Sequence, residues 1–232
     1  MIRQAVILAA GKGTRMKKGQ SDIKILSTPK PLLEINGIPI IQRTVEKLVR
    51  DGIKVALVIN PSDSDKFSDI LCDFDVDYYY QSTALGTANA LRCAREFVTD
   101  DLFAVFMGDD IFNYEDLNLL TINRPTVFGF EVNDVSNYGV IVPDSDSFAK
   151  EIIEKKLKGR GLVNTGIYVF HREFFNIYPK IESNDTSGEY FLTDAIAILY
   201  KSGSPLEIKK IGLWKGINTI EDLRFANGVI HE

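Results

Sequence analysis

Glycines and basic residues lie close together near the amino terminus, where they could bind phosphate. Gly11, Lys12, Gly13 and Arg15 follow a short apolar run, residues 5–9, which has the pattern of a buried parallel strand. Glycines let the backbone approach a phosphate closely and point its N–H groups at it. In a parallel sheet, this loop would lie beyond the carboxyl ends of the strands, where ligands bind.

Taken alone, the loop is equally compatible with a tight turn that carries solvated basic residues, because glycine motifs are common. It is not a typical dinucleotide-binding motif, because Met16 stands where a third glycine or alanine is needed. The second expected strand also ends in Asn60 instead of an acid that could hold a ribose. It is not a P-loop, because glycine follows Lys12 where that motif has serine or threonine.

Alternating strand and helix patterns fill the first half of the chain, whereas strands dominate the second half. In the first half we expect strands at residues 5–9, 54–59, 76–80 and 102–107, helices at 39–50, 63–71 and 87–98, and a long polar loop at 11–30. In the second half we expect strands at 126–132, 139–142, 149–154 and 166–170, and helices at 174–178, 190–200 and 219–229. The order predicts an α/β fold: a doubly wound, mostly parallel sheet that a mixed or antiparallel part extends.

Composition excludes several classes of protein. The 232 residues include 27 basic and 32 acidic residues, and the net charge of −5 argues against a surface that grips nucleic acid. Two cysteines cannot form a disulfide framework. No apolar run approaches the ~20 residues that span a bilayer. We therefore expect a single soluble, cytoplasmic domain, residues 1–232, with no nucleic-acid or membrane partner.

Two segments near the amino terminus resemble a known family. Residues 8–16, Leu-Ala-Ala-Gly-Lys-Gly-Thr-Arg-Met, and residues 29–33, Pro-Lys-Pro-Leu-Leu, resemble the signature of sugar-1-phosphate nucleotidyltransferases. Further matches follow in the family's order at residues 81–88, 108–112, 138–140, 154–155, 164–168, 188–194 and 216–218. One match alone would be weak, but the ordered set is specific.

The resemblance implies a Rossmann-like, GT-A-like fold with a nucleotide-binding lobe at about residues 1–112 and a β-rich sugar-binding lobe at about 113–232. It also implies an enzyme in which a sugar-1-phosphate attacks the α-phosphorus of a nucleoside triphosphate and pyrophosphate leaves. Such in-line transfer needs positioning and charge neutralisation more than an acid–base pair. No covalent enzyme intermediate is implied.

The resemblance also implies roles for individual residues. Arg15, Lys30 and Asp109 would be catalytic, with Arg15 on the leaving phosphates and Lys30 at the point of bond making. The implied nucleotide-binding residues are Ala10, Gly11, Lys12, Gly13, Thr14, Gln81, Gly86 and Thr87. Gln81 has an amide donor and acceptor that match a uracil or thymine edge. The guanylyltransferase branch of the family tends to have an acid at this position, so the resemblance favours UTP or dTTP over GTP. The alternatives are a solvated loop lysine at position 30 and a surface glutamine at position 81.

Mg²⁺ is the implied cofactor, with Asp109 as its first ligand. The second implied ligand is Asn218, because Gly216-Ile217-Asn218 resembles the motif of the uridylyltransferase branch. Carboxylate and amide oxygens are suitable ligands for magnesium. The alternative for Asn218 is a helix cap, since a helix is expected from Thr219. Asp110 is expected to be solvated or to cap a helix.

The implied sugar-binding residues are Gly139, Glu154, Lys155, Asn164 and Thr165. A carboxylate and an amide offer lone pairs to sugar hydroxyls in fixed geometry. The alternative for Glu154 and Lys155 is a solvated face, because residues 151–158 are mostly charged.

The leading function is thus synthesis of a UDP- or dTDP-sugar, with glucose-1-phosphate and N-acetylglucosamine-1-phosphate both open as acceptors. A cytidylyl- or guanylyltransferase that acts on another phosphorylated sugar or alcohol is an alternative, and so is a non-catalytic sugar-nucleotide sensor. Only residues 219–232 follow Asn218, so we expect no acetyltransferase half of the kind that some uridylyltransferases carry. The resemblance leaves a homo-oligomer open.

Overall fold

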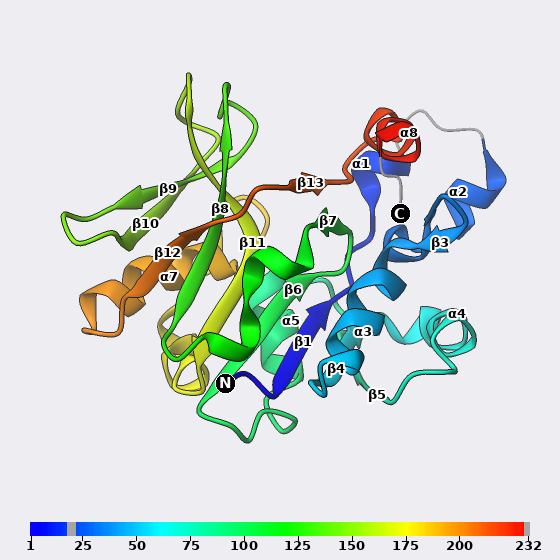
Figure 1. Ribbon diagram of the computed structural model, residues 1–232, viewed down its shortest axis with the longest axis horizontal. Helices are drawn as coiled ribbons and strands as arrows, with labels where there is room; N and C mark the ends of the chain where they lie inside the picture. The colour runs from blue at the N-terminus through cyan, green and yellow to red at the C-terminus, as the bar shows by residue number, and fades with distance from the viewer. Residues whose placement is uncertain (18–21, 230–232) are drawn as a thin grey trace.

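Nine strands form one continuous sheet in residues 1–17 and 22–229, the part of the chain that the computed structural model describes (Figure 1). Its amino-terminal half is parallel, in the order β5 (Val76–Tyr80), β4 (Lys54–Ile59), β1 (Gln4–Leu8) and β6 (Leu102–Met107). Its other half continues with β11 (Gly161–His171), β8 (Thr126–Val132), β12 (Leu206–Lys210), β10 (Phe148–Glu154) and β9 (Gly139–Pro143). There only the β12–β8 pair is parallel among the described strands.

Helices cover both faces of the parallel half, which confirms the doubly wound arrangement. Alternate residues of β1 enter two different hydrophobic clusters, since Val6 packs with α5 (Thr87–Cys93) and Ile7 packs with α3 (Ile40–Arg50). All five residues of β1 are buried. A parallel strand that is covered on both faces is expected to be apolar throughout.

The remaining elements are short. The other helices are α1 (Thr14–Lys17), α2 (Ile23–Ser27), α4 (Ser64–Ile70), α6 (Phe174–Ile177), α7 (Leu192–Lys201) and α8 (Ile220–Val229), with 3₁₀ turns η1 (Lys30–Leu32), η2 (Pro61–Asp63), η3 (Tyr114–Leu117), η4 (Leu119–Thr121) and η5 (Tyr178–Lys180). Two small two-stranded sheets pair β2 (Glu34–Ile35) with β3 (Ile38–Pro39) and β7 (Asp110–Phe112) with β13 (Trp214–Gly216). None of the described helices is long and apolar enough to cross a membrane.

Three sequence-based expectations about the elements are wrong. The polar segment 11–30 contains α1, α2 and part of η1, so it is not one continuous loop. The strand expected at 166–170 is β11, which begins at Gly161 because its first half pairs with β8 and β9. The helix expected at 87–98 ends at Cys93, and a series of turns follows it.

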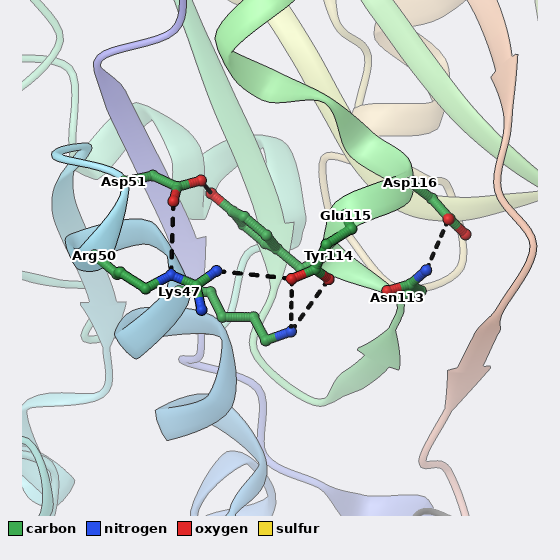
Figure 2. A network of polar contacts seen from close by, with 7 residues as sticks. All are labelled: Lys47, Arg50, Asp51, Asn113, Tyr114, Glu115 and Asp116. Atoms are coloured by element: carbon green, nitrogen blue, oxygen red, sulfur yellow. Dashed lines mark hydrogen bonds and ion pairs between the residues drawn. The ribbon is translucent and has the colours of Figure 1, made fainter. Parts of the chain in front are cut away.

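A polar network holds the segment after β7 against α3 (Figure 2). The Tyr114 hydroxyl donates to Asp51 at 3.0 Å, and Lys47 Nζ donates to both carboxylate oxygens of Glu115 at 3.3 Å. Asp116 accepts from the backbone N–H of Gly212 at 2.8 Å, just before β13 begins. The network therefore links α3 to both strands of the β7–β13 pair.

Candidate active site

The β7–β13 pair brings together two segments that are far apart in the sequence. Gly216 lies opposite Asp110 in this pair, and the backbone N–H of Ile217 donates to the carbonyl of Asp109 at 3.3 Å. The chain crosses from the sheet through β13 to α8 (Figure 1). Met16 of α1 and Ala226 of α8 belong to the same hydrophobic cluster, so these two helices lie near each other. This register places residue 218 beside residue 109, beyond the carboxyl end of β6.

Lys30 lies between the two predicted metal ligands. Its ammonium group forms an ion pair with the carboxylate of Asp109 and donates to Asn218 Oδ1 at 3.4 Å. Lys30 is 8% exposed, so the alternative of a solvated loop lysine is wrong. The neighbouring Pro29 and Pro31 restrict the backbone of this turn. We call Lys30, Asp109 and Asn218 the phosphate cluster.

Asn218 does not cap the helix that follows it. The cap is Thr219, whose Oγ1 accepts from the backbone N–H of Asp222 at 3.1 Å. In return, Asp222 Oδ2 accepts from the backbone N–H of Thr219 at 2.9 Å, which completes a reciprocal capping box. The alternative interpretation of Asn218 is therefore wrong, and its side-chain oxygen faces Lys30 instead.

Asp110 holds β13 in place, so the expectation of a solvated or capping residue is also wrong. Its Oδ2 accepts from the indole Nε1 of Trp214 at 3.1 Å. Gly216 lies against the same carboxylate, because a Cβ there would be 3.2 Å from Asp110 Oδ1 and 3.0 Å from Asn218 Nδ2. A larger residue at 216 would crowd both side chains.

The donor set of the phosphate cluster suits magnesium. Asp109 and Asn218 direct oxygen atoms at the same ammonium group, so the two oxygens lie close to one point. Magnesium prefers hard oxygen ligands and is usually held by one or two protein groups together with substrate phosphates. The described residues contain no cluster of three histidine, cysteine or acidic side chains that could hold a metal ion.

The glycine loop passes beside the phosphate cluster. Gly13 has a φ of +61°, and a Cβ at this position would lie 3.5 Å from the Cβ of Lys30. Gly11 and Lys12 are exposed, and no atom would contact a Cβ at Gly11 within 4 Å. Ala10 is buried, and Thr14 begins α1. The side chain of Arg15 lies outside the described residues.

Gln81 is buried, so the alternative of a surface glutamine is wrong. The nitrogen of its side-chain amide already donates hydrogen bonds to two protein acceptors. Its Nε2 donates to the Gly86 carbonyl at 3.1 Å and to Asn89 Oδ1 at 3.0 Å. Gly86 has a φ of +90°, and a Cβ there would lie 2.4 Å from the Tyr190 carbonyl oxygen. Only glycine fits this close approach.

The segment before α7 holds the loop that carries Gly86. The backbone N–H of Tyr190 donates to the Leu85 carbonyl at 2.8 Å, and Ala88 N–H donates to the Tyr190 carbonyl at 2.9 Å. Thr87 Oγ1 accepts from the backbone N–H of Leu192 at 3.0 Å. Tyr190 belongs to the motif at residues 188–194, but Asn89 is not among the predicted site residues, and no spacing in the sequence indicates the contacts that either of them makes.

The sugar-binding residues predicted on the β9–β10 pair lie together. Gly139 is paired with Glu154, and a Cβ at Gly139 would lie 2.7 Å from Glu154 Oε1. The surrounding protein limits hydration of the Glu154 carboxylate, which raises its pKa; Lys155 lowers the pKa and Asp194 raises it further. Lys155 itself is exposed and has a φ of +48°.

The adjacent residues Asn164 and Thr165 differ in their surroundings. Asn164 is half-buried, and its Nδ2 donates to the Tyr168 hydroxyl at 2.7 Å. Thr165 is 1% exposed, and its hydroxyl donates to the Phe128 carbonyl at 2.7 Å. Successive residues of a strand point to opposite faces, which explains the contrast. The predicted sugar contact of the Thr165 side chain is therefore a misassignment.

A family model and many known proteins match this chain. The model described as "Nucleotidyl transferase" matches residues 4–232. The chain is 32% identical over 225 residues to "Bifunctional protein GlmU" of Methanococcus aeolicus. This alignment covers 96% of this chain and 53% of that protein. It is 33% identical over 229 residues to the protein of the same name from Clostridium beijerinckii, over 91% of this chain and 47% of the relative. The chain thus spans about half the length of these relatives.

Solved structures match over nearly their whole length. A putative glucose-1-phosphate thymidylyltransferase from Bacillus anthracis, in complex with a sucrose, has a TM-score of 0.81 and 25% identity, over 99% of this chain and 96% of that chain. HddC from Yersinia pseudotuberculosis has a TM-score of 0.76 and 26% identity, over 98% of this chain and 99% of that chain. These matches agree with the α/β fold described above. The chain belongs to the nucleotidyl transferase family, which confirms the resemblance seen in its motifs.

Proposed function

We propose that this protein transfers a nucleotidyl group from UTP or dTTP to a sugar-1-phosphate, with Mg²⁺ as cofactor. The observation that carries the proposal is the phosphate cluster, in which one ammonium group contacts a carboxylate and an amide oxygen. The cluster lies beside a glycine loop, beyond the carboxyl ends of parallel strands, where α/β proteins bind ligands. Its charge and oxygen donors suit a triphosphate that binds with a metal ion.

The proposed reaction needs charge neutralisation at the phosphates. An oxygen of the sugar phosphate forms a bond to the α-phosphorus, and the bond from the α-phosphorus to the bridging oxygen of pyrophosphate breaks. Lys30 would stabilise negative charge near the reacting phosphorus, and backbone N–H groups of residues 11–14 would bind the other phosphates. Asp109 and Asn218 would hold the magnesium ion, which supplies further charge neutralisation when bound. Arg15 remains proposed for the leaving phosphates.

Gln81 supports a uracil or thymine base. Its Oε1 takes part in no hydrogen bond among the described residues, so it can accept from the ring N3–H of either base. Guanine carries a ring N–H next to a carbonyl in the same order, so GTP is the second candidate. The larger size of a purine would have to distinguish the two.

Glu154, Gly139 and Asn164 are proposed to bind the sugar. Glu154 lies at the end of β10 with its carboxylate against Gly139, where a side chain would displace it. Lys155 is proposed to reach the sugar phosphate. We infer nucleotide binding in residues of about 1–112 and sugar binding in about 113–232.

A substrate panel tests this proposal. UTP, dTTP, GTP, CTP and ATP are each combined with glucose-1-phosphate and N-acetylglucosamine-1-phosphate at fixed Mg²⁺, and pyrophosphate is measured. The proposal predicts release with UTP or dTTP and one of the two sugars. Release only with GTP would favour the second candidate, and no release with any pair would reject both.

A further inference from the structure

The amide of Gln81 has one fixed orientation in this structure. Both hydrogens of its Nε2 have acceptors, namely the Gly86 carbonyl at 3.1 Å and Asn89 Oδ1 at 3.0 Å. A backbone carbonyl can only accept a hydrogen bond. If the amide flipped, Gln81 Oε1 would face the lone pairs of Gly86, which is unfavourable. The oxygen of Gln81 is therefore the group left for a ligand.

Asn89 and Tyr178 continue this chain of hydrogen bonds. Because Asn89 Oδ1 accepts from Gln81, its Nδ2 points the other way and donates to the Tyr178 hydroxyl at 3.1 Å. Tyr178 is 9% exposed, and the Arg92 guanidinium lies 5.0 Å from its ring centroid. Its ring also packs on Tyr190, with centroids 5.9 Å apart. The series of hydrogen bonds that begins at Gln81 thus ends at Tyr178, an aromatic side chain that is held by packing.

We propose that Asn89 and Tyr178 are positioning residues that keep the Gln81 oxygen toward the nucleotide and so select bases with a ring N–H over bases without one. This proposal rests on the nucleotidyl transfer proposed above. Uracil and thymine carry N3–H, and guanine carries N1–H, whereas cytosine N3 and adenine N1 are bare acceptors. An oxygen that faces a bare ring nitrogen loses a hydrogen bond and leaves two acceptors unpaired.

The acceptor atom of Asn89, Oδ1, matters for selectivity in its own right. Without an acceptor at position 89, only the Gly86 carbonyl still opposes rotation of the Gln81 amide, so orientations that turn a donor toward the base become more populated. Cytosine N3 could then accept from it. Selectivity would fall even if the fold and the phosphate cluster were unchanged.

Three variants test the proposal. Asn89→Leu removes the acceptor at similar volume, Asn89→Asp keeps an oxygen toward Gln81, and Tyr178→Phe removes only the hydroxyl that Asn89 contacts. The kcat/KM values for UTP and CTP are measured with one saturating sugar-1-phosphate, and thermal unfolding is followed in parallel. The informative quantity is the ratio of the two kcat/KM values, which a general loss of stability does not change.

We expect the UTP/CTP ratio to fall about tenfold in Asn89→Leu and about threefold in Tyr178→Phe, mainly through a higher KM for UTP. In Asn89→Asp the ratio should stay within about twofold of wild type, since the acceptor is kept. If Asn89→Leu does not fold, Tyr178→Phe decides. An unchanged ratio in the folded variants, whatever their activity, would overturn the proposal.

Calorimetric dissociation constants of UTP and CTP separate this proposal from the proposed function. If wild type binds UTP but releases no pyrophosphate with any sugar, the proposed function fails, and the ratio of dissociation constants in the variants still tests the positioning roles. If wild type binds UTP and CTP equally, the positioning proposal fails, and turnover with UTP alone keeps the proposed function.

Discussion

The phosphate cluster differs in construction from the residues proposed to bind the sugar, Gly139, Glu154, Lys155 and Asn164, which we call the sugar-binding side. Lys30 contacts both Asp109 and Asn218, and its side chain is almost fully buried. Glu154 and Lys155 lie at the end of the β9–β10 pair, which forms one side of the sheet (Figure 1). Lys155 is exposed, and Glu154 is open to solvent on one side although the surrounding protein limits the hydration of its carboxylate. The first group is therefore preorganised, whereas the second has room for different ligands.

This difference matches the role that we propose for each part. Stabilising charge at a reacting phosphorus requires fixed groups in a site with little water. Selecting one sugar over another depends on hydroxyl contacts that can vary between relatives on the same fold. Substitutions in the phosphate cluster should therefore lower kcat, and substitutions on the sugar-binding side should mainly raise KM.

The largest effect is expected for Asp109→Ala. The change removes the proposed first metal ligand and the ion-pair partner of Lys30. We expect kcat to fall by about 10³-fold, the upper range for removing a group that stabilises a charged transition state. Steady-state pyrophosphate release measures it, with circular dichroism as the control for folding. Activity within a few-fold of wild type would contradict the assignment.

Asn218→Ala and Thr219→Ala form a matched pair of neighbouring changes. Asn218→Ala should raise the Mg²⁺ concentration for half-maximal activity by about 10- to 100-fold, by analogy with other losses at metal sites. Thr219→Ala removes the helix cap and should cost about 1 kcal/mol of stability while leaving the Mg²⁺ dependence unchanged. Magnesium titrations and thermal unfolding of both variants check this. If Asn218→Ala kept normal Mg²⁺ dependence, Asn218 would not be a ligand.

On the sugar-binding side, Glu154→Gln should raise the KM for the sugar-1-phosphate about tenfold with little change in kcat. Gly139→Ala should have a similar effect, because its Cβ would lie 2.7 Å from Glu154 Oε1 and displace the carboxylate. Steady-state kinetics with varied sugar phosphate measures both. A fall in kcat with unchanged KM would mean that Glu154 acts on the reaction instead of on binding.

The raised pKa of Glu154 predicts a pH effect on sugar binding. The ionised carboxylate is the form that accepts hydrogen bonds from hydroxyl groups. Because limited hydration raises its pKa, protonation begins at a higher pH than for an ordinary glutamate. The KM for the sugar phosphate should therefore rise as the pH falls through this pKa. Glu154→Gln should lack this component, and identical pH profiles for the two proteins would contradict it.

The smallest effect on the reaction is expected for Tyr114→Phe. The change removes the 3.0 Å hydrogen bond to Asp51 in the network that holds the segment after β7 (Figure 2). We expect a loss of about 1 kcal/mol in the free energy of unfolding and a kcat within about twofold of wild type. Denaturant unfolding measures the free energy of unfolding, and steady-state pyrophosphate release measures kcat. A large fall in kcat would show that the β7–β13 pair depends on this anchor.

Much of the parallel half could be predicted from the sequence. The expected strands 54–59 and 102–107 coincide with β4 and β6, because strands covered on both faces read as apolar runs. The expected strand 76–80 coincides with β5, an edge strand that is only half-buried and is rich in tyrosine, a residue type favoured in strands. The β7–β13 pair could not be predicted, since each strand has three residues and their pairing is long-range. That pair is what brings Asn218 to Asp109.

The candidate site shows the same limit. Motifs single out Lys30, Asp109 and Asn218, but the contacts of Lys30 with the other two residues depend on the fold. The inward orientation of Thr165 could not be inferred, since the expected strand 166–170 leaves out the first half of β11, in which Asn164 and Thr165 lie. The hydrogen bonds of Gln81 with Asn89 involve side-chain orientations that no sequence pattern reports.

The most direct test of the central claim follows the label from UTP carrying ³²P at the β- and γ-positions, with Mg²⁺. The account predicts that the label leaves as pyrophosphate only when a sugar-1-phosphate is present, in an amount equal to the nucleotide sugar formed. Asp109→Ala should abolish this release. Orthophosphate as the product, or pyrophosphate released equally without the sugar, would indicate hydrolysis of the triphosphate and contradict the account.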